Sequence, residues 1–344
     1  MILIKIDILS MALERKPEPV RNAKEGKAED VMHQPIKLYL LTGFLGAGKT
    51  TMLLSLLNGG GVAGKKIGVI QNEFGKLSID GALLQRGDIE MQEISNGSIF
   101  CSCLKLQFVS ALAEMSKQGL DMLFVESSGL ADPSNLEEIL AAVEVLCADQ
   151  PYTLAGTICL VDGVDFLENA ADLETVVRQI VHCNIALLNK CDLISPARVQ
   201  AVKEQIRQYN ENCLIVETEQ GRLDPCLLEQ DLSHYQWAPG EASTNTVDTK
   251  PKTFSISFEI SVPWEKLRRF LEGVLPDCYR IKGFCQTDMG WQQVDVVGDR
   301  IDRKPCQARA NSQLVFISKT GIQLIRRIHD TWQVQVGLPV QLHN

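Results

Sequence analysis

Apolar runs of five to nine residues recur between residues 36 and 218 and are separated by longer amphipathic segments. The runs are continuous rather than alternating, which is typical of strands that are buried on both faces of a parallel sheet. The predicted strands are KLYLLT (37–42), KIGVIQN (66–72), DMLFVE (121–126), LAGTICLVD (154–162), IALLNK (185–190) and CLIVE (213–217). Helical patterns lie between them, for example at 104–118 and 133–146. This alternation predicts an α/β domain at 36–218 whose parallel sheet is covered on both faces.

The pattern changes on both sides of that domain. Residues 1–35 are charged and without periodicity, so we expect a disordered leader. Residues 219–252 are polar and predict a linker. A smaller α+β domain with an antiparallel sheet is expected at 253–334.

Six segments carry the expectation for this second domain. TFSISFEI (253–260) alternates as a half-buried strand does, and residues 263–275 fit an amphipathic helix with proline near its start. The pieces YRIKGFCQ, WQQVDVV and SQLVFIS predict further strands, and a last helix is expected at 320–331.

Composition narrows the class of protein. The net charge of −9 argues against a protein whose main task is to bind nucleic acid. No apolar run approaches the roughly 20 residues that span a bilayer, so we expect no membrane contact and a cytoplasmic location. Eleven scattered cysteines do not suggest a disulfide framework, and most fit buried positions.

A glycine-rich loop follows the first predicted strand and opens a helix. Its residues 43–50 read GFLGAGKT, and this spacing in this context is that of a P-loop. Glycines let backbone N–H groups curl around phosphates, Lys49 supplies a charge to them, and the Thr50 hydroxyl is a ligand for Mg²⁺. The residues expected to hold the nucleotide phosphates are Gly43, Gly46, Ala47, Gly48, Lys49, Thr50 and Thr51.

A second motif, NKCD at 189–192, ends a later strand on the edge where ligands bind in such sheets. The Asp192 carboxylate can accept hydrogen bonds from two N–H groups of guanine, a pair that adenine lacks. Asn189 and Lys190 would brace the loop and pack the base. The motif therefore predicts a preference for GTP.

The third strand ends in Glu126, within ESSGLADP. An acidic residue at this place helps to hold Mg²⁺ through water or positions the attacking water. Gly129 would let the backbone approach the γ-phosphate and move when that phosphate leaves. The candidate catalytic residues are accordingly Lys49, Glu126 and Gly129; the alternative is that Glu126 only caps the following turn.

Six motifs occur in the order and spacing of the CobW family of metal-associated P-loop GTPases, and the chain resembles that family over residues 36–330. They are GFLGAGKTT, QNEFGKLSIDGALL, ISNGSIFCSCL, ESSGLADP, LVDG and LLNKCDL. RIKGF with its flanking strands is similar to the family's C-terminal domain. The resemblance implies slow, Mg²⁺-dependent GTP hydrolysis coupled to delivery of zinc, cobalt, a corrinoid or iron to a client protein.

The proposed metal motif departs from the family's GCxCC pattern. Ser98 and Phe100 replace its first two cysteines, Cys101 matches the third, Cys103 is an additional thiol, and Lys76 replaces an acidic residue. The position therefore loses two soft ligands and a negative charge.

Two readings of the remaining thiols stay open. Cys101 and Cys103 can ligate Zn²⁺ or Co²⁺ if Glu73 or a histidine completes a tetrahedron. Alternatively they bind no metal, or act in thiol redox chemistry or contact with a corrinoid client.

Three functions are compatible with these motifs. The first is a GTP-hydrolysing chaperone for a metal- or corrinoid-dependent client, in which GTP holds Glu73 and the 126–132 segment in one arrangement. The second is a non-catalytic, nucleotide-gated interaction module. The third, a small-molecule kinase, would require an arginine-rich lid that the sequence does not contain.

Overall fold

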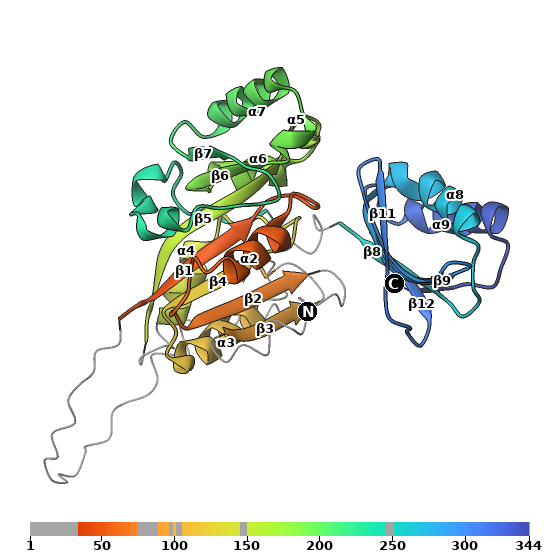
Figure 1. Ribbon diagram of the computed structural model, residues 1–344, viewed down its shortest axis with the longest axis horizontal. Helices are drawn as coiled ribbons and strands as arrows, with labels where there is room; N and C mark the ends of the chain where they lie inside the picture. Colours follow the sequence, from red (N-terminus) through yellow and green to blue (C-terminus); the bar gives the residue numbers. More distant parts are fainter. Residues whose placement is uncertain are drawn as a thin grey trace, which may run out of the picture. The chain divides into compact units, whose positions relative to one another are not determined.

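A computed structural model describes residues 34–73, 89–95, 99–100, 105–144, 150–244 and 251–343. The leader expected at 1–35 lies almost entirely outside these ranges. The described residues form two sheets, one in each of the regions that the hydrophobic pattern separates (Figure 1).

Within the described residues, the first sheet has seven strands in the order β3-β2-β4-β1-β5-β6-β7, and neighbouring strands run parallel. The strands are β1 (Ile36–Thr42), β2 (Ile67–Glu73), β3 (Ile89–Ser95), β4 (Met122–Glu126), β5 (Tyr152–Asp162), β6 (Ile185–Asn189) and β7 (Leu214–Glu217). The predicted parallel α/β sheet is confirmed. Strand β3 was not predicted, because this edge strand reads IEMQEIS and lacks the continuous apolar run of the central strands.

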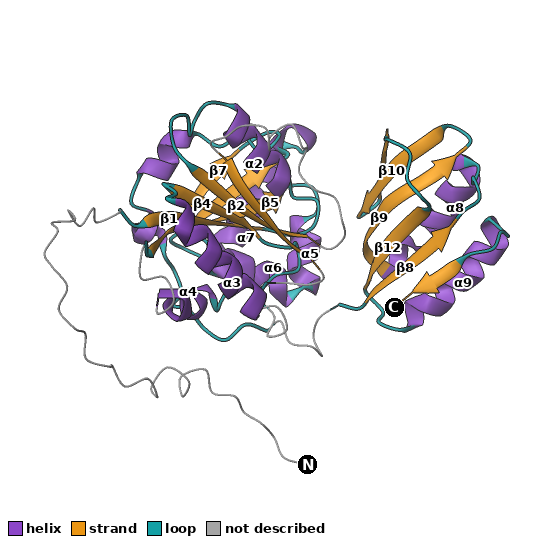
Figure 2. Cartoon of the chain, turned by 90° about the horizontal axis from the view of Figure 1, so that it is seen from below, coloured by secondary structure: helices purple, strands orange, loops and turns teal. Residues whose placement is uncertain are grey.

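Helices cover both faces of this sheet (Figure 2). Helix α2 and the 3₁₀ helices η4 and η5 pack on one face, and α3 to α7 pack on the other. The bounds are α2 (Lys49–Asn58), α3 (Lys105–Met115), η2 (Ser116–Gln118), α4 (Leu136–Glu144), α5 (Phe166–Asp172), α6 (Glu174–Val181), η3 (Cys191–Leu193), α7 (Pro196–Tyr209), η4 (Pro225–Glu229) and η5 (Leu232–Tyr235).

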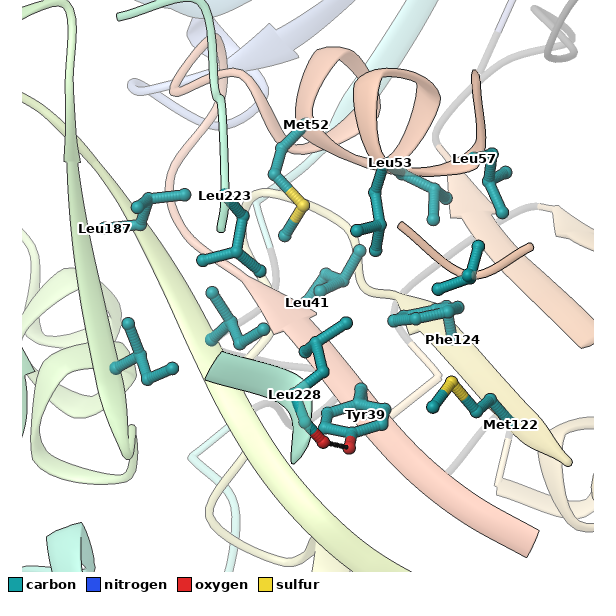
Figure 3. Packing of buried hydrophobic residues seen from close by; sticks show 14 of the residues in the cluster. Tyr39, Leu41, Met52, Leu53, Leu57, Met122, Phe124, Leu187, Leu223 and Leu228 are labelled. Atoms are coloured by element: carbon teal, nitrogen blue, oxygen red, sulfur yellow. Dashed lines mark hydrogen bonds between the residues drawn. The ribbon is translucent and has the colours of Figure 1, made fainter. Parts of the chain in front are cut away.

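The core beneath α2 is drawn in Figure 3. Met52, Leu53 and Leu57 of α2 face the apolar side chains of β1 and β4. The rings of Tyr39 and Phe124 stack there with their centroids 5.4 Å apart. This packing fixes α2, and therefore the loop that precedes it, above the ends of the central strands.

Part of the expected linker belongs to this core instead. Leu223, Leu228 and Leu232 are buried against the sheet, and the Tyr39 hydroxyl donates a hydrogen bond to the Leu228 carbonyl at 2.5 Å. The segment 219–252 reads as polar because its apolar residues are in the minority and follow neither a helical nor a strand period, yet those residues suffice to attach short 3₁₀ turns.

The second sheet is antiparallel, as predicted, and its described strands follow the order β11-β10-β9-β12-β8-β13. Helices α8 and α9 cover one of its faces (Figure 2). The bounds are β8 (Thr253–Phe258), α8 (Trp264–Val274), η6 (Leu275–Asp277), β9 (Cys278–Thr287), β10 (Gly290–Val297), β11 (Arg300–Pro305), β12 (Ser312–Ser318), α9 (Gln323–Gln335) and β13 (Gln341–His343).

The last helix begins later than the sequence suggests, at Gln323 rather than 320. Gly321 has a φ of 65°, and the Ser318 hydroxyl accepts a hydrogen bond from the Thr320 N–H. Because a residue with positive φ cannot be part of a right-handed helix, the helix begins only after this turn. Among the described residues, none of the helices has both the length and the apolar character needed to cross a bilayer.

Candidate functional site

The loop that joins β1 to α2 lies against the neighbouring strands β5 and β6. Its glycines Gly43, Gly46 and Gly48 have φ values of 127°, 77° and 105°, a region that favours glycine. A Cβ atom on Gly43 would lie 2.2 Å from the Leu160 carbonyl oxygen, and one on Gly48 would lie 2.5 Å from Nδ2 of Asn189. The glycines of this loop are therefore required both by its backbone conformation and by its close packing against β5 and β6.

Lys49 begins α2 and turns back into this loop. Its Nζ donates hydrogen bonds to the carbonyl oxygens of Gly43 at 2.6 Å and Phe44 at 3.1 Å, and the residue is buried. The first turn of α2 contains no acidic residue, so the positive end of the helix dipole is not neutralised there. An ammonium group and a helix N-terminus in one small loop favour a polyanion such as a phosphate chain.

Thr50 and Glu126 meet at the carboxyl end of β4. The Thr50 hydroxyl donates to Oε1 of Glu126 at 2.5 Å, and Oε2 of Glu126 accepts from Nε2 of Gln71 at 3.1 Å. Glu126 is buried. A hydroxyl and a carboxylate side by side offer the oxygen ligands that Mg²⁺ prefers, so the residues present fit this ion.

Gly129 lies three residues beyond Glu126 and touches the phosphate loop. A Cβ atom here would be 2.6 Å from the backbone nitrogen of Leu45. Only glycine therefore allows the two loops to approach this closely. The carbonyl of Gly129 accepts a hydrogen bond from Nε2 of Gln179 on α6 at 3.3 Å.

The NKCD motif follows β6 and is tied to the phosphate loop. Nδ2 of Asn189 donates to the Ala47 carbonyl at 2.8 Å, and its Oδ1 accepts from the Gly221 N–H at 2.9 Å. Lys190 adopts a φ of 66°. Asp192 is exposed on η3, where its carboxylate is accessible to a ligand.

Sequence reasoning missed several residues that complete this site. Nζ of Lys190 forms an ion pair with Oδ2 of Asp162 at 2.5 Å, which holds the lysine across the end of β5. Gln71 positions Glu126, and Gly221 positions Asn189. Two of these residues stand where a site residue could be expected, because LVDG places Asp162 at the end of a strand and Gln71 lies just before Asn72 near the end of β2. Neither the motif nor the position, however, predicts which side chain the residue contacts.

The predicted ligands of a zinc or cobalt ion fall largely outside the described residues. Cys101 and Cys103 lie outside them, and for Glu73 the structure describes only the backbone at the end of β2. The neighbouring Asn72 anchors this region, because its Oδ1 accepts from the Ile99 N–H at 3.1 Å. No group of three His, Cys, Asp or Glu side chains within the described ranges could hold a metal ion.

Of the predicted site residues that are described, the structure gathers those of the P-loop with Glu126, Gly129 and Asn189 at the carboxyl ends of β1, β4 and β6. The arrangement provides the Lys49 ammonium group, a helix N-terminus, oxygen ligands for Mg²⁺ and the exposed Asp192 carboxylate, which can bind a nucleotide base. It can hold a nucleoside triphosphate with its phosphates over α2.

Comparisons with known proteins agree with this geometry. Residues 37–217 match the family model described as CobW/HypB/UreG, nucleotide-binding domain, and residues 252–327 match the Cobalamin synthesis protein cobW C-terminal domain.

Two curated relatives and one solved structure illustrate the similarity. The zinc chaperone YjiA of Escherichia coli is 34% identical over 223 residues, which are 63% of this chain and 66% of that relative. The zinc chaperone CobW of Pseudomonas aeruginosa is 29% identical over 326 residues, covering 82% of this chain and 86% of the relative. The crystal structure of Zn(II)-bound YjiA GTPase from E. coli has 24% identity and a TM-score of 0.45, and the match covers 88% of this chain and 99% of that one.

The first family model covers more than half of the 344 residues, in the same region that builds the nucleotide site. The chain therefore belongs to the CobW/HypB/UreG family of nucleotide-binding proteins.

Proposed function

We propose that this protein binds GTP with Mg²⁺, hydrolyses it to GDP and phosphate, and uses the cycle to deliver a metal to a client protein. The observation that carries the proposal is the contact between Thr50 and Glu126 at 2.5 Å, beside a P-loop that Asn189 ties to the NKCD motif. These contacts join the parts for phosphate binding, Mg²⁺ binding and guanine recognition in one site.

Each residue has a defined task in this proposal. Lys49 leaves its carbonyl partners in the loop and binds the β- and γ-phosphates, which are stronger acceptors than carbonyl oxygens. Thr50 and Glu126 would hold Mg²⁺, Glu126 through water, and the ion would offset negative charge on the phosphates. Gly129 presents its backbone N–H toward the γ-phosphate, and Asp192 accepts hydrogen bonds from guanine.

The cargo that we propose first is zinc. Support comes from the names of the two curated relatives, both zinc chaperones. Cys101 and Cys103 with Glu73 are the proposed ligands, and the client is a protein that depends on zinc, cobalt or a corrinoid.

Hydrolysis is tested by measuring phosphate release from GTP with Mg²⁺. We expect turnover by the wild type and a fall to background in Lys49→Ala, because the variant loses the charge that binds the β- and γ-phosphates. Glu126→Gln should reduce the rate by about 10²-fold or more if the carboxylate acts on the attacking water.

Lys65→Ala is the matched control, since Lys65 is an exposed lysine of the same domain. It should retain the wild-type rate. A wild type that releases phosphate no faster than Lys49→Ala would remove the hydrolase and leave a nucleotide-gated binding module.

A further inference from the structure

Part of the chain between the first sheet and β8 is hydrogen-bonded to the nucleotide-binding part. Residues 236–244, here called the tether, run along the loop at 127–135, here called the switch loop, which follows Glu126 and contains Gly129. Near the start of the tether, Nε2 of Gln236 and the N–H of Gly240 both donate to the carboxylate of Glu137. These bonds place the tether beside the end of the switch loop.

Asp132 of the switch loop is the centre of the attachment. It is fully buried, and its Oδ2 accepts from the Thr244 N–H at 2.6 Å and from the Thr244 hydroxyl at 2.8 Å. Oδ1 accepts from the Ser134 N–H and hydroxyl, and the Asp132 carbonyl accepts from the Ser243 hydroxyl at 3.2 Å. Burial by itself raises the pKa of Asp132, but the hydrogen bonds from Ser134 and Thr244 outweigh it and hold the pKa below its ordinary value. The group is therefore a carboxylate at neutral pH.

Arg178 of α6 joins the same two segments. Its Nε lies 2.8 Å from Oδ2 of Asp132, and its Nη2 donates to the Ala242 carbonyl at 3.0 Å. Nη2 also lies 3.1 Å from Oε1 of Glu241, whose own N–H donates to the Ser134 carbonyl at 2.9 Å. The guanidinium thus bridges a buried carboxylate and the tether, an arrangement that fixes direction as well as distance.

The same helix also holds the part of the switch loop that packs against the phosphate loop. Nε2 of Gln179, adjacent to Arg178, donates to the carbonyls of Gly129 and Ala131 at 3.3 and 2.8 Å. Gly129 in turn packs against Leu45 of the phosphate loop. Leu130 and Ala131, which lie between Gly129 and Asp132, are buried, so we expect a displacement of Gly129 to reach Asp132 through close packing.

We propose that Asp132, Arg178 and Thr244 form a latch through which the switch loop passes the nucleotide state to the tether and so toward β8. The latch rests on the proposed GTP cycle. With the γ-phosphate present, Gly129 stays in contact with the phosphate loop and Asp132 keeps the tether bound. Loss of the phosphate releases the switch loop, the bonds to Thr244 weaken, and the tether gains freedom.

The latch is tested by hydrogen–deuterium exchange of the full chain, read at the peptide amides of residues 236–244. The wild type is compared with GDP and with a non-hydrolysable GTP analogue. We expect slower exchange with the analogue. Thr244→Val, which removes the hydroxyl donor but keeps the shape and the N–H, should speed exchange about tenfold with the analogue and shrink the difference between the two nucleotides.

Thr253→Val is the matched control, because among the described residues the buried Thr253 hydroxyl has no hydrogen-bond partner. It should behave as the wild type does. Equal exchange of the wild-type tether in both nucleotides, or a difference between the nucleotides that is undiminished in Thr244→Val, would overturn the latch. Nucleotide affinity is measured on the same samples: bound nucleotide without a tether response contradicts the latch alone, whereas absence of GTP binding contradicts the proposed function and the latch with it.

Discussion

Among single residues, the side chains of the NKCD motif differ in burial and in their contacts. Asn189 is buried and bonds to two neighbouring loops, at Ala47 and Gly221. Lys190 is held by Asp162. Asp192 alone of the three is exposed. A rigid support for the loop and an accessible carboxylate at its tip fit the expected recognition of guanine, whose two N–H donors would both reach that carboxylate.

Replacing Asp192 by asparagine tests this recognition. The amide presents one donor where guanine also has a donor, so we expect the preference for GTP over ATP to fall by about 10²-fold or more. Competition of GTP and ATP against a fluorescent guanine nucleotide measures the preference. Glu211→Gln, an exposed carboxylate at the amino end of β7, serves as control and should change nothing. An unaltered preference in Asp192→Asn would mean that another group recognises the base.

At the scale of elements, β1 organises the nucleotide-binding part. It pairs with β4 on one side and β5 on the other, so the strand before the phosphate loop lies beside the strands that end in Glu126 and Asp162. Its Tyr39 also reaches across to Leu228 of η4. The 3₁₀ segment that follows β7 is thereby fastened to the central strand, far from it in sequence.

Tyr39→Phe isolates this bond. The variant keeps the ring stack on Phe124 but leaves the Leu228 carbonyl without its donor, so we expect a loss of about 1–3 kcal/mol in the free energy of unfolding at pH 7. Urea denaturation measures the loss. A difference near zero would show that the bond adds no net stability.

The same pair of proteins should differ in their response to alkali. Burial, with Glu229 adding to it, raises the pKa of Tyr39 to about 12, so folding favours the neutral phenol. The corresponding stability is complete below the ordinary pKa near 10 and is lost as the pH rises toward 12. The advantage of the wild type over Tyr39→Phe should therefore shrink in that range.

At the scale of the whole molecule, nucleotide and metal chemistry draw on different stretches of chain. The nucleotide site is built from residues at the ends of β1, β4 and β6, whereas no group of three His, Cys, Asp or Glu side chains that could hold a metal ion is found among the described residues. A zinc or cobalt site made of three or more such side chains therefore needs at least one ligand from outside the described ranges, and Cys101 with Cys103 are the soft candidates there.

Zinc titration of the full chain examines this assignment. We expect Zn²⁺ to bind the wild type and to bind the Cys101→Ser/Cys103→Ser variant at least tenfold more weakly, because hydroxyls replace thiolates as ligands. Cys226→Ser, at an exposed cysteine, is the matched control and should bind as the wild type does. Calorimetry with and without GTP provides the readout. Superimposable isotherms for wild type and double variant would exclude these thiols.

The class of fold and most of the phosphate site follow from local patterns in the sequence. A continuous apolar run of a few residues is enough to predict a buried strand, and the spacing of Gly43, Gly48 and Lys49 predicts a loop whose conformation depends on its own residues. Strand β3 and the packing of residues 219–244 escaped prediction, because an edge strand and a 3₁₀ segment are stabilised by contacts with distant elements rather than by their own pattern.

Which polar residues meet depends on the folding of segments that are distant in sequence. Thr50 and Glu126 are 76 residues apart, Asn189 and Ala47 are 142 apart, and Asp132 and Thr244 are 112 apart. A carboxylate or an amide can pair with many partners, so its sequence position does not select one. The selection comes from the parallel sheet, which brings the carboxyl ends of separate strands to one edge, and from burial, which makes each buried polar group costly without its partner.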